Sequence, residues 1–220
     1  RNLERAEDIS RDAMLAGIRA QELPEDKERY CVTTAMMRYA RAVALASIGD
    51  LPAAENESAL FDEALSRVPE SRNLFNNTCL DILAIAREMM LGEIEYRKGN
   101  FEQAFAHLSN SVELEDNLPY DEPWGWMQPA RHALGALLLE QDRVEEACRI
   151  YREDLGYGDT ISRASQHPDN VWSLHGYHEC LIRLGRTAEA ELIEQRLRLA
   201  NARTDVPVAA SCFCRLEADG

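Results

Sequence analysis

The sequence has few basic residues and no long apolar run. Only 24 basic side chains stand against 39 acidic ones, so the net charge is -15. Such a charge repels the phosphates of nucleic acids and of anionic lipids, and we expect neither nucleic acid nor a membrane as a partner. The best apolar run, residues 133–139, is far shorter than the roughly 18 residues that a membrane-spanning helix needs.

Glycine and proline are also scarce, at 11 and 8 of 220 residues. With 45% hydrophobic and 29% charged residues, this composition predicts a soluble, helix-rich chain and argues against disorder or a collagen-like structure. The chain also lacks a glycine-rich phosphate loop, a nucleophile elbow, an HExxH motif and an EF-hand loop. Phosphoryl transfer and serine hydrolysis therefore have no support in the sequence.

Cysteine is too sparse to indicate a disulfide scaffold, because a chain of this length can build its own core. We expect inert buried thiols at Cys31, Cys79, Cys148 and Cys180. The chain begins with Arg1 rather than Met, which suggests an excerpt or a processed form. We expect a cytoplasmic protein, and a removed signal peptide stays open as an alternative.

A repeated turn organises the chain. Four segments share a turn residue, an apolar residue two positions later and an alanine five positions later; they begin at Gly49, Gly99, Asp142 and Gly185. The small residues Ala42, Gly92 and Gly135 lie seven positions before three of these turns. A small residue on one helix lets the next helix approach closely, so the pattern predicts tightly packed helix pairs.

This order of Leu-Gly, turn, aromatic or aliphatic residue and Ala resembles the tetratricopeptide repeat, a helix–turn–helix unit of about 34 residues. The resemblance implies an all-α, right-handed solenoid with a concave groove. The expected parts are a half repeat at 2–18, units near 30–65, 82–116, 128–156 and 171–203, and an extended cysteine-containing tail over 204–220. A HEAT-type repeat is the alternative, which the fixed offset between small residue, turn and alanine disfavours.

Two segments also resemble a group of bacterial and fungal tetratricopeptide-repeat proteins. They are Glu122–Pro129, followed by Arg131-His132-Ala-Leu-Gly, and the ending Ser211-Cys-Phe-Cys-Arg215. The resemblance implies that both segments belong to one site. It implies no particular reaction.

In the tetratricopeptide family, set positions of each first helix line the concave groove where ligands bind. Carried over to this sequence, these positions hold Tyr39, Met89, Glu93, His132, Trp172, His175 and Glu179. The segment before the third unit adds Trp124 and Trp126, which offer large rigid contact surfaces. We expect them to form a pocket wall or lid, and capping of the hydrophobic stack is the alternative.

Histidines and the tail cysteines form a candidate metal set. His132 and His175 occupy equivalent positions of adjacent units, whose helix axes pack about 8 to 10 Å apart. His178 lies one turn from His175, and Cys212 and Cys214 point the same way in an extended segment. If the tail folds back over the groove, these imidazoles and thiolates suit zinc or copper. Satisfied polar histidines and a disulfide-prone terminus are the alternative.

Several functions remain open. In the first, the groove binds copper or zinc together with a small molecule, and the protein is a metal-dependent enzyme or a binding protein. In the second, the groove captures a peptide or partner helix without catalysis. In the third, the chain is the C-terminal cap of a longer solenoid, because the half repeat lacks its first helix. His107 and His167 have no predicted role, and the oligomeric state is open.

Overall fold

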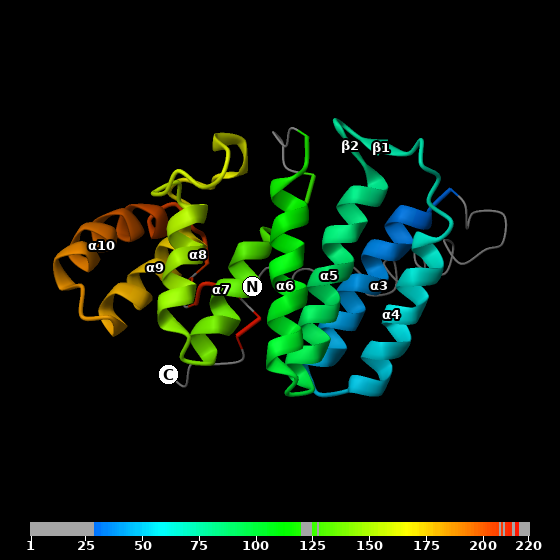
Figure 1. Cartoon of the computed structure of the whole chain (residues 1–220), viewed down its shortest axis with the longest axis horizontal. Coiled ribbons are helices and arrows are strands. Elements are labelled where there is room, and N and C mark those ends of the chain that lie inside the picture. The colour runs from blue at the N-terminus through cyan, green and yellow to red at the C-terminus, as the bar shows by residue number, and fades with distance from the viewer. Residues whose placement is uncertain are drawn as a thin grey trace.

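A computed structural model describes residues 29–119, 125, 126, 128–206, 208, 210–212, 214 and 215. Within these residues the chain is mostly helical, with eight α-helices in sequential antiparallel pairs. The pairs follow one another along the long axis of the molecule (Figure 1). The predicted helical class and its helix–turn–helix pairs are confirmed. The half repeat expected at 2–18 lies outside the described residues.

In the described part of the chain the eight helices form four consecutive pairs. The helices are α3 (Cys31–Ser47), α4 (Leu51–Leu65), α5 (Cys79–Arg97), α6 (Phe101–Asp116), α7 (Ala130–Glu140), α8 (Val144–Asp154), α9 (Val171–Arg183) and α10 (Thr187–Asn201). A short 3-10 helix, Arg163–Ser165, lies between α8 and α9. None of the helices in the described part of the chain has the length and apolar character needed to cross a membrane.

The four repeated turn residues all adopt the left-handed backbone conformation. Their φ angles are 85° at Gly49, 82° at Gly99, 59° at Asp142 and 68° at Gly185. In each turn the next amide donates to a carbonyl five residues earlier, as in Asp50 to Leu45, which caps the end of the first helix. The fold therefore uses glycine, or aspartate at the third turn, where left-handed backbone is required.

The small residues before the turns mark close helix contacts. A Cβ at Gly92 would lie 2.6 Å from Leu108 Cγ of α6, and one at Gly135 would lie 2.5 Å from Tyr151 Cζ of α8. On α9 the close contact is made by Gly176, and His178 is half-buried. A Cβ at Gly176 would lie 2.3 Å from the same Tyr151 ring atom, on α8 of the preceding pair. The Tyr151 ring therefore fills the space left by two glycines on neighbouring helices.

A short hairpin joins α4 to α5 and was not predicted. Strand β1 (Asn73–Leu74) pairs antiparallel with β2 (Asn77–Thr78). Phe75 in its turn has a φ of 53°, which is uncommon for an aromatic residue and has no local sequence signature. Thr78 then caps α5 by accepting a hydrogen bond from the Asp81 amide.

Candidate functional site

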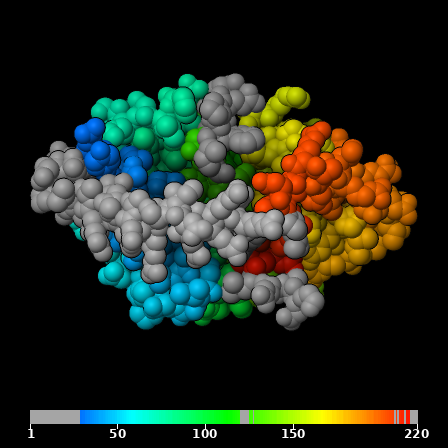
Figure 2. Space-filling model, turned by 180° about the vertical axis from the view of Figure 1, so that it is seen from behind, coloured from blue at the N-terminus to red at the C-terminus, as the bar shows by residue number. Residues whose placement is uncertain are grey.

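The C-terminal tail folds back onto the helices. Tyr151 Oη of α8 donates to Ser211 Oγ at 2.6 Å, and Arg97 Nη2 of α5 donates to the Cys214 carbonyl oxygen. Arg215 pairs with Glu179 Oε2 of α9 at 2.7 Å. In Figure 2 the red tail atoms lie beside the surface of the α9–α10 pair. The return of the tail over the helices, on which the predicted metal set depends, is therefore present.

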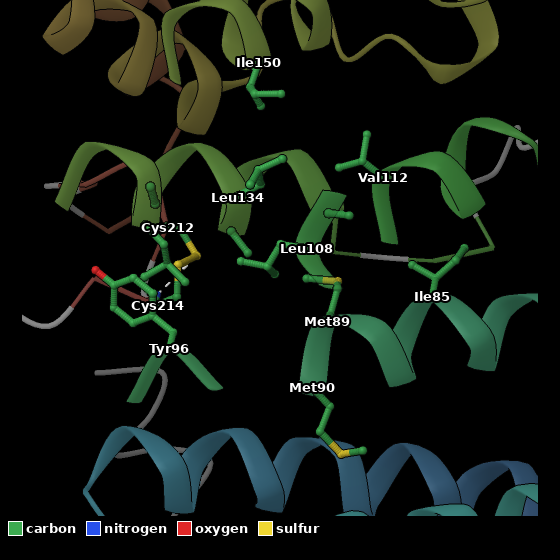
Figure 3. Close-up of a cluster of buried hydrophobic side chains, with 14 of the residues drawn as sticks. Ile85, Met89, Met90, Tyr96, Leu108, Val112, Leu134, Ile150, Cys212 and Cys214 are labelled. Carbon is green, nitrogen blue, oxygen red and sulfur yellow. Dashed lines mark hydrogen bonds between the residues drawn. A yellow bond between two sulfur atoms is a disulfide. The ribbon is translucent and has the colours of Figure 1, made fainter. Parts of the chain in front are cut away.

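The two tail cysteines are bonded to each other rather than presented as free thiols. Cys212 and Cys214 form a disulfide and are 6% and 8% exposed. Figure 3 shows both within a cluster of buried side chains that includes Tyr96 and Leu134. In this form neither cysteine supplies the thiolate that a zinc or copper site requires.

His132 belongs to a buried network around Asp154, which is fully buried at the end of α8. His132 Nε2 lies 3.2 Å from Asp154 Oδ2, and His167 Nδ1 lies 2.7 Å from Oδ1. Asn170 Nδ2 and Ser173 Oγ donate to Oδ2 at 2.9 and 2.5 Å. Burial alone would raise the pKa of Asp154, but the hydrogen bonds and charges of the two histidines hold it well below its ordinary value.

This network accounts for the contacts of two of the histidines. His167 has no predicted role, yet it is 6% exposed and tied to Asp154. The sequence carries no signal for the contact, since His167 lies in the connection between α8 and α9 rather than on a helix face. His132 is hydrogen bonded as a structural residue, so its Nε2 is not free to bind a metal unless the bond to Asp154 breaks.

The remaining predicted metal ligands lie on α9. His175 and His178 are both half-buried. Burial lowers the pKa of His175, and the nearby Glu179 opposes that effect. Nowhere in the described ranges do three or more histidine, cysteine, aspartate or glutamate side chains come together so that they could hold a metal ion. Metal binding by the predicted donor set stays a prediction.

Three of the predicted groove residues are packed against one another. The Tyr39 and Trp126 rings meet edge to face at 5.2 Å between centroids, and Trp126 Nε1 donates to Met89 Sδ at 3.0 Å. Tyr39 Oη donates to Gln128 Oε1 at 3.2 Å. Tyr39, Met89 and Trp126 are all buried, so they belong to the core rather than to an open groove wall. Trp124 lies outside the described residues.

The other predicted groove residues lie at more polar positions. Trp172 is half-buried near the start of α9. Glu179, also half-buried, pairs with Arg183 Nη1 at 3.2 Å as well as with Arg215. Glu93 on α5 is only 3% exposed, and its closest cation is Arg97, with Nη2 at 3.9 Å from Oε2.

The pKa of Glu93 is strongly perturbed. Burial raises its pKa to about 7, with a further contribution from Glu140, and Arg97 opposes the increase. Its Oε2 atom accepts no hydrogen bond. A buried carboxylate normally receives several hydrogen bonds, so this oxygen has unused bonding capacity near neutral pH.

Glu93 is one of three residues with unused polar atoms around the tail. Arg97 Nε and His175 Nδ1 are likewise buried without a hydrogen-bond partner. Arg97 donates a hydrogen bond to the Cys214 carbonyl oxygen, and the charge of Arg215 lowers the pKa of His175. We call Glu93, Arg97 and His175 the tail-flanking cluster, since they lie on α5 and α9 next to these two tail residues.

Comparisons with protein-family models, with curated proteins and with solved structures found no match.

Proposed function

We propose that the protein binds a small polar molecule at the tail-flanking cluster. The observations that carry the proposal are that Glu93 Oε2, Arg97 Nε and His175 Nδ1 are all buried without a hydrogen-bond partner, that Arg97 binds the Cys214 carbonyl oxygen and that Arg215 acts on His175. A buried polar atom without a partner costs about 1 to 3 kcal/mol. A ligand that bonds to these atoms would remove much of that cost.

The cluster's chemistry indicates the kind of ligand. Arg97 Nε carries a hydrogen to donate, and an ionised Glu93 Oε2 can only accept. The ligand therefore needs an acceptor and a donor on neighbouring atoms. An amide group and an α-amino acid both meet this requirement.

The position of the cluster agrees with the tetratricopeptide resemblance. Helices α5 and α9 are the first helices of their pairs, which in that family line the inner surface. We infer that the four pairs form a tetratricopeptide-type solenoid and that the cluster lies in its groove. Binding of copper or zinc by His132, His175, His178, Cys212 and Cys214 stays a prediction, because it requires both reduction of the tail disulfide and loss of the His132–Asp154 bond.

A peptide is the second candidate ligand, and the tail itself favours it. The chain's own segment is held at this site partly through a main-chain carbonyl, the acceptor on Cys214. A foreign peptide with the same main-chain groups would compete with the tail. Peptide binding would therefore depend on tail release, whereas binding of a small molecule would not.

A thermal-shift experiment tests the proposal. The full chain is melted with a panel of free amino acids, their primary amides and small carboxylic acids. A ligand present at about 100 times its Kd stabilises the folded state by about 2.7 kcal/mol, which raises the Tm of a chain of this size by roughly 5 to 10 °C. We expect at least one amide or amino acid to do so.

Two substitutions on α5 locate the effect. Glu93→Gln replaces the free carboxylate by a neutral amide, and we expect the ligand-induced shift to disappear. Glu88→Gln is the matched control, because Glu88 is on the same helix but binds His107 Nδ1 at 2.7 Å. A shift that survives Glu93→Gln, or a panel without any active compound, would contradict the proposal.

A further inference from the structure

A pocket of about 350 Å³ lies among α8, α9, α10 and the connection that follows α8, at one end of the molecule (Figure 1). Arg152 of α8, Tyr157 of the connection and Tyr177 of α9 line it together with residues of α10. No residue of the tail-flanking cluster is in its wall. Pockets for small molecules enclose about 300 to 1,000 Å³, so this one has room for a single small ligand.

Two tyrosine rings and two aliphatic side chains form the apolar part of the wall. The Tyr157 and Tyr177 rings are 5.9 Å apart between centroids and inclined by 49°. Leu192 and Ile193 belong to α10. Ile193 is buried, whereas Leu192 is 66% exposed. A flat aromatic ligand in contact with these side chains would remove the exposed surface of Leu192 from water.

Arg152 leaves the wall with one uncompensated positive charge. It is exposed and forms no side-chain hydrogen bond or ion pair within the described part of the chain. The other two charged wall residues have partners. Glu189 accepts two hydrogen bonds from Arg186, at 2.7 and 2.6 Å, and Arg196 Nε pairs with Asp169 Oδ1 at 3.2 Å. In a chain with a net charge of -15, this wall is therefore a local place for a single negative charge.

The two tyrosine hydroxyls add hydrogen-bond donors. Tyr177 is only 4% exposed, yet its hydroxyl forms no hydrogen bond within the residues that the structure describes. Burial raises the pKa of Tyr177, so this hydroxyl keeps its proton near neutral pH. The Tyr157 oxygen accepts a hydrogen bond from Arg196, which leaves its own proton available to a ligand. A ligand that matches these groups is an acceptor.

We propose that this pocket binds a small aromatic monocarboxylate. Arg152 supplies the matching charge, the tyrosine hydroxyls supply hydrogen bonds to the carboxylate, and Leu192 and Ile193 cover the aromatic body. The site is independent of the tail-flanking cluster, whose proposed ligand must donate a hydrogen bond as well as accept one.

Isothermal titration calorimetry of the full chain with two probes tests the proposal. The probes are 2-naphthoate and 2-naphthalenemethanol, which share a ring system, and only the first is charged. We expect 2-naphthoate to bind at about one site per chain and the neutral alcohol to bind about tenfold more weakly. Equal affinities, or no binding of 2-naphthoate at millimolar concentration, would overturn the proposal.

Two arginines on α8 form a matched pair for the charge. Arg152→Gln should weaken 2-naphthoate binding about three- to tenfold and leave the neutral alcohol unchanged. Arg149→Gln makes the same change in net charge, but Arg149 lies outside the pocket wall and pairs with Glu153 at 3.0 Å. It should change the affinity by less than about twofold. Equal losses in the two variants would overturn the role of Arg152.

Two exposed leucines on α10 form a matched pair for the apolar contact. Leu192→Ala should weaken both probes about two- to fivefold, because the ligand loses contact with that side chain. Leu199→Ala should weaken neither, since Leu199 is 68% exposed and lies outside the pocket wall. Both leucines are exposed, so neither variant removes a buried core side chain.

Glu93→Gln separates this pocket from the tail-flanking cluster. We expect the affinity for 2-naphthoate to be unchanged in this variant, whatever its effect on amides and amino acids, because Glu93 is not in the pocket wall. Loss of 2-naphthoate binding in Glu93→Gln, with retention in Arg152→Gln, would place the probe at the cluster and would overturn the proposal.

Discussion

Replacing Glu93 by glutamine is expected to stabilise the protein at alkaline pH. In the unfolded chain this carboxyl group ionises at its ordinary pKa of 4.5, and in the folded protein it ionises at about 7. The folded state therefore holds the proton more tightly, so the contribution of this group to stability is greatest below pH 4.5. That contribution falls as the pH rises from 4.5 to 7 and then stays low.

The size of the effect follows from the two pKa values. Their difference of about 2.5 corresponds to about 3.4 kcal/mol, at 1.36 kcal/mol for each pKa unit. Glu93 is 3% exposed, so solvent screens this cost very little. Glutamine has nearly the same shape and cannot ionise. We expect Glu93→Gln to raise the free energy of unfolding at pH 8 by roughly 2 to 3 kcal/mol and to change it little at pH 4.5.

Urea unfolding of both proteins between pH 4.5 and pH 8 measures this difference directly. Glu115, whose pKa burial raises to about 8, is present in both chains and cancels in the comparison. Glu88→Gln on the same helix should show no such gain. If Glu93→Gln is less stable than the parent at pH 8, or if its effect is the same at both pH values, burial of an uncompensated carboxyl group is refuted.

Three further substitutions probe buried contacts of the helix pairs and the tail. Asp154→Asn should lower the free energy of unfolding by about 3 kcal/mol, because it removes the negative charge that both His132 and His167 contact. A decrease of less than about 1 kcal/mol in urea unfolding would contradict this. Gly135→Ala should lower the free energy of unfolding by about 1 to 3 kcal/mol, because the added methyl group overlaps the Tyr151 ring. Gly158→Ala should lower it far less, since a Cβ there would lie 3.7 Å from its nearest neighbour, Thr160 Oγ1. Tyr151→Phe leaves the buried Ser211 hydroxyl without its partner, so limited proteolysis should cut the tail faster, and unchanged cutting would argue against this bond as an anchor.

The helix pairs could be predicted because their signals are local. Gly49, Gly99 and Gly185 provide the left-handed backbone of three of the four turns, and Ala54 and Gly92 leave room for the neighbouring helix. Both requirements act over a few residues and recur at a fixed offset. The sequence pattern therefore carries them directly.

The site was only partly predictable, because its contacts join distant parts of the chain. Glu93 was a candidate through the repeat pattern, but its pairing with Arg97 near Cys214 depends on where the tail returns. The position of His132 on a helix face indicated a ligand, whereas the actual partner is Asp154 on the next helix. Such side-chain contacts depend on three-dimensional packing, which the spacing of residues along the sequence does not determine.

A crystal structure of the full chain, grown with the most stabilising compound of the amino-acid and amide panel, most directly tests whether the tail-flanking cluster binds a ligand. We expect density for a small molecule that hydrogen bonds to Glu93 Oε2 and Arg97 Nε, with the tail still held by Arg97 and Glu179. Density for water alone at these atoms, or for the compound bound elsewhere on the protein, would contradict the proposed function.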